Sequence, residues 1–263
     1  MLRLLCLILA TSLNVCSAEK IRVASFSPGA TQTLIDLGLS DNIVAATPWC
    51  PLPTSHPASR DCDIFNPDLE KLLKIKPDLC ILPRLANPLW ANRCRSAGLN
   101  VLLLSPESAH AVPDDIRLIG KALQKAPEAE NLANYFLRQP RLLQKKILII
   151  WDGMMAGRDS YLGDPLARAA HISPLAQATW QKLDWEMVVQ ANPDCILWIE
   201  SRPDNSPIVS SEKHLQELRK IPAVKDLSCV KNSQIYETTS GSDWLPGSGL
   251  IRASEKVFGL YHK

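Results

Sequence analysis

The chain has 263 residues, of which 46% are hydrophobic and 21% are charged, as in an ordinary globular protein. This composition disfavours a disordered chain, a collagen-like repeat and a polytopic membrane protein. Lysine and arginine (29) nearly balance aspartate and glutamate (27), so the net charge is only +2. The charge therefore gives no reason to expect nucleic acid or an anionic membrane as a partner.

The first 18 residues have the features of a secretory signal peptide. Arg3 precedes the apolar stretch Leu4–Ala10, and small side chains occupy the end of the segment. We predict cleavage after residue 18 and export of a soluble chain to the periplasm. A lipid-anchored protein is the alternative, but Cys16 lacks the small residues expected just before a lipidated cysteine. No later segment has about 20 unbroken apolar residues, so no transmembrane helix is predicted.

Removal of the signal peptide would leave an even number of cysteines in a compartment where disulfides persist: Cys50, Cys62, Cys80, Cys94, Cys195 and Cys229. Sequence proximity favours Cys50 with Cys62 and Cys80 with Cys94, which leaves Cys195 with Cys229. The connectivity stays open, and Cys80 and Cys195 lie in apolar runs where inert buried thiols are the alternative. No metal site is predicted, because the chain has no C-x-x-C and its histidines are scattered.

Two segments of the chain follow the same plan. Residues 69–82 and 185–198 each begin with a short helical pattern, in which a glutamate (Glu70 or Glu186) occupies the second position. In both, a Pro-Asp pair ends the helix and a continuous apolar strand follows. Such strands are typical of sheets covered on both faces. A duplicated α/β lobe explains the match, and two unrelated helix-to-strand transitions are the alternative.

Residues 113–144 separate these halves and show helix-period apolar positions without a strand signal. We therefore predict an α/β fold with two Rossmann-like lobes, mostly parallel sheets, a helical connector and a ligand cleft between the lobes. The predicted boundaries are a signal peptide (1–18), an N-terminal lobe (19–112), a connector (113–145) and a C-terminal lobe (146–263).

Three loops after predicted strands are candidates to line the cleft. The first contains Ser27 and Pro28 ahead of a helix predicted over 32–37, where backbone N–H groups can receive a polar ligand; a plain capping turn is the alternative. The second places Trp49 between prolines in a short loop. The third, residues 241–249, is rich in glycine and serine and contains Ser242, Asp243 and Trp244.

Four other tryptophans fall into two groups. Trp185 and Trp198 fall inside the repeated helix and strand, where core packing is favoured. Trp90 and Trp180 lie in or beside loops, where they could face a flat ligand. The motifs of hydrolases, nucleotide-binding enzymes and zinc proteases are absent from the sequence, so no catalytic residues are predicted and the protein is not expected to be an enzyme.

These residues resemble the helical-backbone substrate-binding proteins of ABC importers, which take up cobalamin, haem and ferric siderophores. Residues 22–31 look like the opening strand and turn of that family, and residues 66–82 are similar to its Asn-Leu-Glu segment. The third likeness is Ser242-Asp243-Trp244 leading into the last helix. The resemblance covers essentially the whole chain after the predicted signal peptide.

The resemblance is nearest to the cobalamin branch, which has an aromatic at the position of Trp49 and a Ser-Asp-Trp loop. It implies that a corrinoid is held edge-on between the lobes, with no cofactor of the protein's own. Haem is an alternative, although no tyrosine occupies the position of Trp49. A ferric siderophore is another, for which Arg84 and Arg202 could serve. An exported cysteine-dependent enzyme or redox protein is the rival from another class.

The family also implies a docking role for Glu70 and Glu186, one on each lobe, with the membrane permease subunits of an importer as partner. Independently of the family, two exposed glutamates at equivalent places would suit a two-fold partner. The alternative is that both carboxylates only complement the helix dipole, an effect of about 0.3–1 kcal/mol. We expect a monomer that contacts a small molecule and a permease, and no nucleic acid.

Overall fold

The computed structural model describes residues 20–65, 67–83, 88–105, 111–137, 145–163 and 179–259. The predicted signal peptide over residues 1–18 and the candidate Arg84 lie outside these residues. Within the described part of the chain, no helix is long and apolar enough to cross a membrane.

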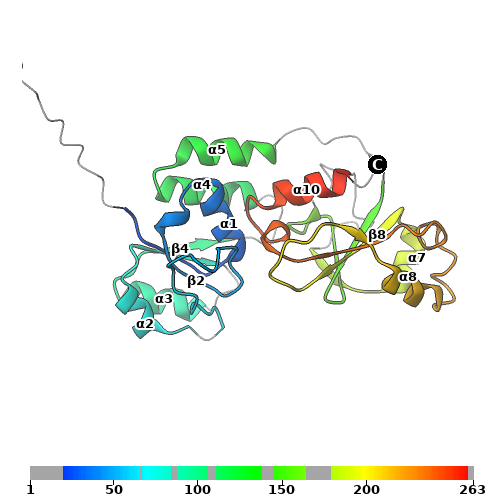
Figure 1. The fold of residues 1–263 in the computed structure, drawn as a ribbon, viewed down its shortest axis with the longest axis horizontal. Coiled ribbons are helices and arrows are strands. Elements are labelled where there is room, and N and C mark those ends of the chain that lie inside the picture. The colour runs from blue at the N-terminus through cyan, green and yellow to red at the C-terminus, as the bar shows by residue number, and fades with distance from the viewer. Residues whose placement is uncertain are drawn as a thin grey trace, which may run out of the picture.

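The N-terminal lobe is built on a four-stranded sheet in the order β2-β1-β3-β4, and all neighbouring strands run parallel. Its strands are β1 (Val23–Ser25), β2 (Ile43–Ala46), β3 (Leu79–Pro83) and β4 (Val101–Leu104). Its helices are α1 (Pro28–Asp36), η1 (Ser40–Asn42), α2 (Leu69–Ile75) and α3 (Pro88–Ser96). In Figure 1, α2 and α3 lie on one side of this sheet and α1 lies on the other, towards α4.

The C-terminal lobe has a six-stranded mixed sheet in the order β7-β6-β5-β8-β10-β9. The central strands β5 (Ile147–Trp151), β8 (Cys195–Glu200) and β10 (Ile235–Thr239) run parallel. Antiparallel pairings add β6 (Met154–Ala156), β7 (Trp180–Lys182) and β9 (Val209–Ser210). Its helices are α7 (Trp185–Ala191), α8 (Glu212–Arg219), α9 (Ser228–Lys231), η2 (Ser242–Trp244) and α10 (Leu250–Gly259). The predicted α/β fold with mostly parallel sheets in two lobes is thus confirmed.

The two halves repeat one another in detail. In the N-terminal lobe, the backbone N–H of Arg22 donates to Asp78 Oδ2 at 2.7 Å, and the Arg22 side chain donates to the last carbonyls of α2. In the C-terminal lobe, the N–H of Lys146 donates to Asp194 Oδ2 at 2.7 Å, and the Lys146 side chain donates to the Ala191 carbonyl at the end of α7. The Pro-Asp pairs therefore tie each helix end to the start of the neighbouring strand.

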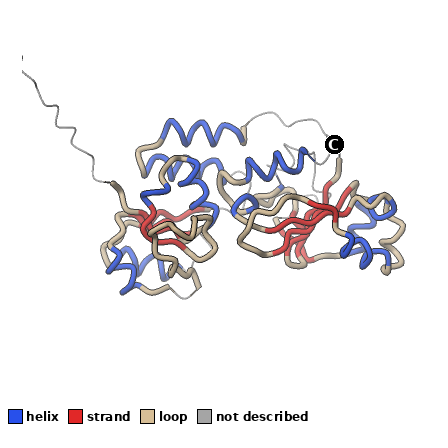
Figure 2. The backbone as a smooth tube through the Cα atoms, in the orientation of Figure 1, coloured by secondary structure: helices blue, strands red, loops and turns tan. Residues whose placement is uncertain are grey.

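The segment between the lobes forms two packed helices, α4 (Ala111–Ala122) and α5 (Ala126–Tyr135), which appear one above the other in Figure 2. The second of these helices ends at Tyr135. Gly120 allows the close approach of the two helices, because a Cβ there would lie 2.1 Å from the Cβ of Ala129. Residues 138–144 of the predicted connector lie outside the described residues.

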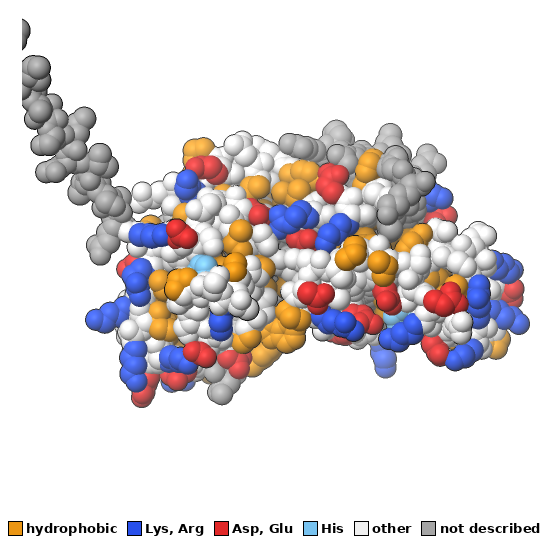
Figure 3. Space-filling model, viewed as in Figure 1, with side chains coloured by type: hydrophobic (Ala, Val, Ile, Leu, Met, Phe, Trp, Pro, Cys, Tyr) orange, Lys and Arg blue, Asp and Glu red, His pale blue; other side chains and the backbone are white. Residues whose placement is uncertain are grey.

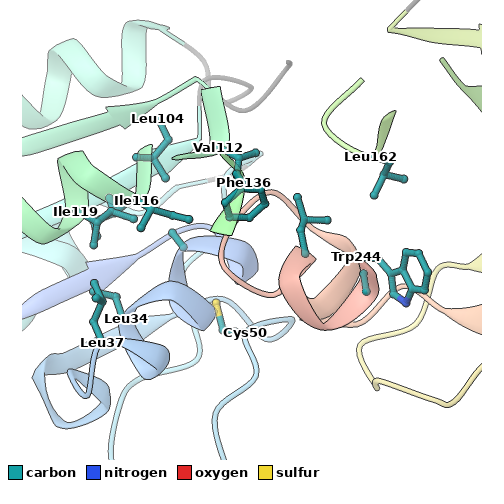
Figure 4. Close-up of a cluster of buried hydrophobic side chains, with 14 of the residues drawn as sticks. Leu34, Leu37, Cys50, Leu104, Val112, Ile116, Ile119, Phe136, Leu162 and Trp244 are labelled. Carbon is teal, nitrogen blue, oxygen red and sulfur yellow. The ribbon is translucent and has the colours of Figure 1, made fainter. Parts of the chain in front are cut away.

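One hydrophobic core runs through both lobes and the helices between them. Phe136 and Trp244, which are almost fully buried, share this core with residues of both sheets (Figure 4). At the same junction, a Cβ on Gly29 would lie 2.0 Å from the Pro246 carbonyl oxygen. Helix α1 therefore packs directly on the backbone of the loop that follows η2, and the lobes meet through a continuous packed contact.

Candidate functional site

The turn after β1 is a helix cap. Ser27 has extended backbone angles, and its side chain accepts a hydrogen bond from the N–H of Ala30 at 3.3 Å. Pro28 is the first residue of α1, so the helix begins four residues earlier than the predicted start at residue 32. Ser27 is buried and Pro28 is half-buried. The capping interpretation therefore accounts for Ser27 without a ligand, and a polar ligand contact there stays a prediction.

Exposed aromatic side chains follow β2. The side chain of Trp49 is 54% exposed in the loop directly after this strand, and that of Phe65 is 89% exposed. After the loop, Ser59 pairs with Ala45 in the parallel direction, and the N–H of Cys62 donates to the Ala46 carbonyl. The chain thus runs beside β2 a second time, which brings Phe65 to the same end of the sheet. A lone phenylalanine in a loop gave no signal in the sequence.

The Ser242–Trp244 segment, in contrast, is buried between the lobes. Trp244 is 0% exposed and Ser242 is 1% exposed, and the Ser242 hydroxyl donates to Gln32 Oε1 of α1 at 2.8 Å. Asp243 accepts from Arg252 Nε at 2.7 Å and from Lys256 Nζ at 2.9 Å. The loop composition suggested ligand contacts, but in this structure these three side chains join η2 to α1 and α10.

The arginine of this junction also connects the lobes. Arg252 Nη1 lies 3.1 Å from Asp36 Oδ2 of α1, and the Ser248 hydroxyl donates to the same carboxylate. Because Asp36 is in the N-terminal lobe while Arg252 and Ser248 are in the C-terminal lobe, this network crosses the junction. A ligand contact with Trp244 would require the loop to leave these partners.

Aromatic side chains also gather at the C-terminal lobe. Trp151 ends β5, and its ring lies 6.2 Å from that of Trp180 in an edge-on arrangement. The Tyr161 ring also packs against Trp180, with the two ring centroids 5.7 Å apart. All three are half-buried. From the sequence, Trp90 and Trp180 could face a flat ligand. Trp180 belongs to this aromatic group, whereas Trp90 is 3% exposed and packs edge-on against Phe26.

The carboxyl ends of the strands of both lobes face one region of the molecule. Helix α1 follows β1, η2 follows β10, and the Ser242–Gln32 hydrogen bond joins these two elements. The carboxyl ends of both sheets therefore point towards the junction, where α/β proteins bind their ligands. Figure 3 shows an indentation of the surface between the lobes and hydrophobic side chains along the adjacent edge of the N-terminal lobe.

A surface hollow of about 550 Å³ lies elsewhere, at the amino ends of β3 and β4. Its lining includes Leu79, Arg95 and Val101. The hollow lies opposite the strand ends that carry the aromatic side chains, so it is separate from the candidate ligand surface.

Glu70 and Glu186 occupy equivalent positions. Each lies in the first turn of its helix, two residues after an aspartate N-cap, Asp68 in α2 and Asp184 in α7. Both glutamates are exposed, and neither forms an ion pair among the described residues. Both glutamates are therefore exposed at equivalent places on the two lobes, and their docking role stays a prediction.

The six cysteines differ from the expected disulfide bridges. No disulfide joins any of the buried residues Cys50, Cys62, Cys80, Cys94, Cys195 and Cys229 in the described part of the chain. The Thr31 hydroxyl donates to Cys50 Sγ at 3.0 Å, and the other sulfurs pack among apolar side chains. Burial raises the pKa of Cys62 and Cys80 to about 12 and that of Cys229 to about 11. Such thiols are poorly reactive.

We therefore expect a chain that begins at residue 19 to show no thiol reactive towards an aromatic disulfide reagent at about pH 8 in its folded state. After unfolding in denaturant without a reductant, all six thiols should react. The burial and raised pKa of these groups are the physical reason. If only two thiols, or none, react in the unfolded chain, the chain contains the disulfide bridges that the sequence suggested.

Two α/β lobes packed through helices, with strand ends of both facing the junction, form an architecture in which ligands bind between the lobes. The chain belongs to the periplasmic binding protein family, whose model matches residues 23–241. A curated relative, an uncharacterized ABC transporter substrate-binding lipoprotein (YvrC) of Bacillus subtilis, is 22% identical over 260 residues. The match covers 91% of this chain and 79% of the relative.

Solved structures share the fold over nearly the whole chain. The periplasmic haem-binding protein HutB of Vibrio cholerae superposes with a TM-score of 0.73 at 17% identity, covering 93% of this chain and 100% of that one. The periplasmic vitamin B12-binding protein BtuF of Vibrio cholerae gives 0.65 at 19% identity, covering 91% and 95%. A possible iron-binding protein of Staphylococcus epidermidis gives 0.70 at 20% identity, covering 92% and 97%.

Proposed function

We propose that this protein is exported to the periplasm, captures cobalamin or a related corrinoid, and delivers it to an ABC importer without chemistry of its own. The observation that carries the proposal is the pair of aromatic surfaces beside the strand ends. Trp49 and Phe65 expose large flat side chains on one lobe. Trp151 and Trp180 supply a second aromatic surface on the other.

A corrinoid suits these surfaces because it is a broad ring with apolar edges, which aromatic side chains can contact over a large area. The ligand would lie beside the buried junction, with Trp49 and Phe65 on one side. Trp244 would support the floor of the site from within the core, because its ring is fully enclosed. Ser242 and Asp243 would hold that floor through Gln32 and Arg252.

Haem binding by the same fold is less favoured by the described residues. Haem iron in proteins is held by histidine, cysteine, methionine or tyrosine side chains. Tyr161 is the tyrosine nearest the aromatic surface of the C-terminal lobe, and burial raises its pKa above the ordinary value, which opposes an iron-binding phenolate. His56 is engaged elsewhere, with Nε2 3.1 Å from the Ser40 carbonyl and Nδ1 accepting from Ala58 N–H.

The decisive experiment is a calorimetric titration of the folded protein with cyanocobalamin, run beside haemin and a ferric hydroxamate. Tight one-to-one binding of the corrinoid alone is the expected result. A signal only with an iron ligand would keep the binding-protein role and replace the corrinoid. No binding of any of the three would rule out these ligands and leave the family assignment with a different ligand.

Substitution of the exposed aromatics tests the site itself. We expect Trp49→Ala combined with Phe65→Ala to weaken corrinoid binding by about 10-fold or more, because each lost aromatic contact costs on the order of 1–3 kcal/mol. Leu118→Ala removes another exposed apolar side chain, on α4, and serves as the control. Equal affinities of the double variant and the control would place the ligand away from β2.

A further inference from the structure

Three potential metal ligands from separate elements come together in the C-terminal lobe. Glu200 ends β8, Glu237 lies on β10 and His214 lies on α8, and one ligand atom of each lies within 4.8 Å of the other two. The His214 Nε2 to Glu237 Oε2 distance is 3.8 Å. More than ten residues separate each of these side chains from the next, so no short motif in the sequence reveals the cluster.

Sheet register explains why the carboxylates face the histidine. Glu237 pairs with Trp198, and Thr239 pairs with Glu200, across the parallel strands β10 and β8. Because paired residues and alternate residues of a strand point to the same face, Glu200, Glu237 and Trp198 share one face of the sheet. Helix α8 covers this face, and the imidazole of His214 stacks on the Trp198 ring with centroids 4.4 Å apart.

The orientation of the side chains is fixed by neighbours. Ser211 caps α8, accepting from the N–H of His214 and donating to Glu237 Oε2 at 2.5 Å. The Trp198 ring holds the plane of the imidazole. His214 Nε2 is buried without a hydrogen-bond partner among the described residues, and it points into the cluster. A buried imidazole nitrogen without a partner is costly, which indicates an absent ligand atom.

We propose that Glu200, His214 and Glu237 form a binding site for a zinc ion. An imidazole nitrogen and carboxylate oxygens are ligand atoms that zinc accepts, and with three protein ligands a water molecule would complete the tetrahedron. Bonds of about 2.0–2.2 Å put two ligands of one zinc ion roughly 3.4 Å apart, so side-chain shifts of about 1 Å would close the present cluster. The side chains are only partly buried, which leaves a path for the ion.

Two cations compete for the same carboxylate. Arg202 Nη2 lies 2.9 Å and Lys213 Nζ 3.5 Å from Glu200 oxygens, and both basic side chains are mostly exposed. Exposed ion pairs of this kind are weak, so zinc can displace them. They nevertheless lower the negative potential of the cluster, and their removal should strengthen zinc binding.

The test is a calorimetric titration with zinc chloride of protein first stripped with a chelator. Wild type should bind one equivalent of zinc. Glu200→Gln and Glu237→Gln should each bind zinc about 10-fold more weakly or worse, since each loses one ligand. Both substitutions keep the size of the side chain, and thermal unfolding in chelator checks the fold. Glu212→Gln, a neighbouring carboxylate on α8, is the matched control and should bind like wild type. Zinc stoichiometry and affinity equal in all four proteins would overturn the proposal.

Two further measurements identify the place of binding. Cobalt(II), used in place of zinc, should quench the fluorescence of Trp198 because this ring stacks on His214. Trp198→Phe should remove that component, and quenching that persists in full would contradict the site. Arg202→Ala combined with Lys213→Ala should bind zinc more tightly than wild type. Weaker zinc binding by this variant would also contradict it.

Discussion

Trp244→Ala is expected to lower the free energy of unfolding by roughly 3–5 kcal/mol, the cost of removing a large buried aromatic ring from a core. Trp244 is fully buried in the hydrophobic core that both lobes share (Figure 4). Its neighbours cannot close the gap easily, because Ser242 is tied to Gln32 and Asp243 to Arg252. The lost ring would therefore leave a cavity at the junction.

Urea unfolding followed by circular dichroism measures this loss. Trp244→Phe is the matched control: it keeps a ring in the same place and removes Nε1, which is buried without a hydrogen-bond partner among the described residues. We expect a smaller loss for this variant, because an unpaired buried donor disappears. Wild-type stability in Trp244→Ala, together with lost corrinoid affinity, would instead show that the tryptophan turns outward to contact the ligand.

Local patterns were sufficient to predict the repeated lobes. The Pro-Asp pair after each short helix is a local stop signal. The structure explains its recurrence, since Asp78 and Asp194 accept from the N–H groups of Arg22 and Lys146, just before the neighbouring strands. Continuous apolar strands likewise indicated a sheet covered on both faces, as found for β3 and β8. The helix stop, the apolar strand and the equivalent positions of Glu70 and Glu186 could be read from short stretches of sequence, whereas the hydrogen bonds of Asp78 and Asp194 join distant parts of the chain.

The candidate site was less predictable because its contacts join distant parts of the chain. A loop rich in glycine and serine is equally suited to bind a ligand or to pack closely on another element. Here Gly29 meets the Pro246 carbonyl, so the small residues serve packing between lobes. Phe65 reaches the strand ends only because residues 59–62 run beside β2, a pairing with no local sequence signal.

The two free glutamates have geometry that suits a partner with two equivalent binding pockets. Each lies in the first turn of a short helix whose N-cap side chain, Asp68 or Asp184, already satisfies backbone N–H groups. The carboxylates of Glu70 and Glu186 are thus not needed for capping. An importer with two related permease subunits would present two equivalent surfaces, and a basic side chain in each could pair with one glutamate.

We therefore expect Glu70→Ala combined with Glu186→Ala to abolish stimulation of the importer while corrinoid affinity stays unchanged. Truncating one partner of a buried interfacial charge pair costs roughly 2–5 kcal/mol, and this variant removes two. Uptake into vesicles that contain the reconstituted importer measures the effect, and calorimetry measures ligand affinity. Glu212→Ala combined with Glu217→Ala removes the same charge from α8 and should transport normally. Normal uptake with the Glu70 and Glu186 variant would show that docking relies on other parts of the surface. The role of both residues would then be limited to placing a favourable charge at the helix N-terminus.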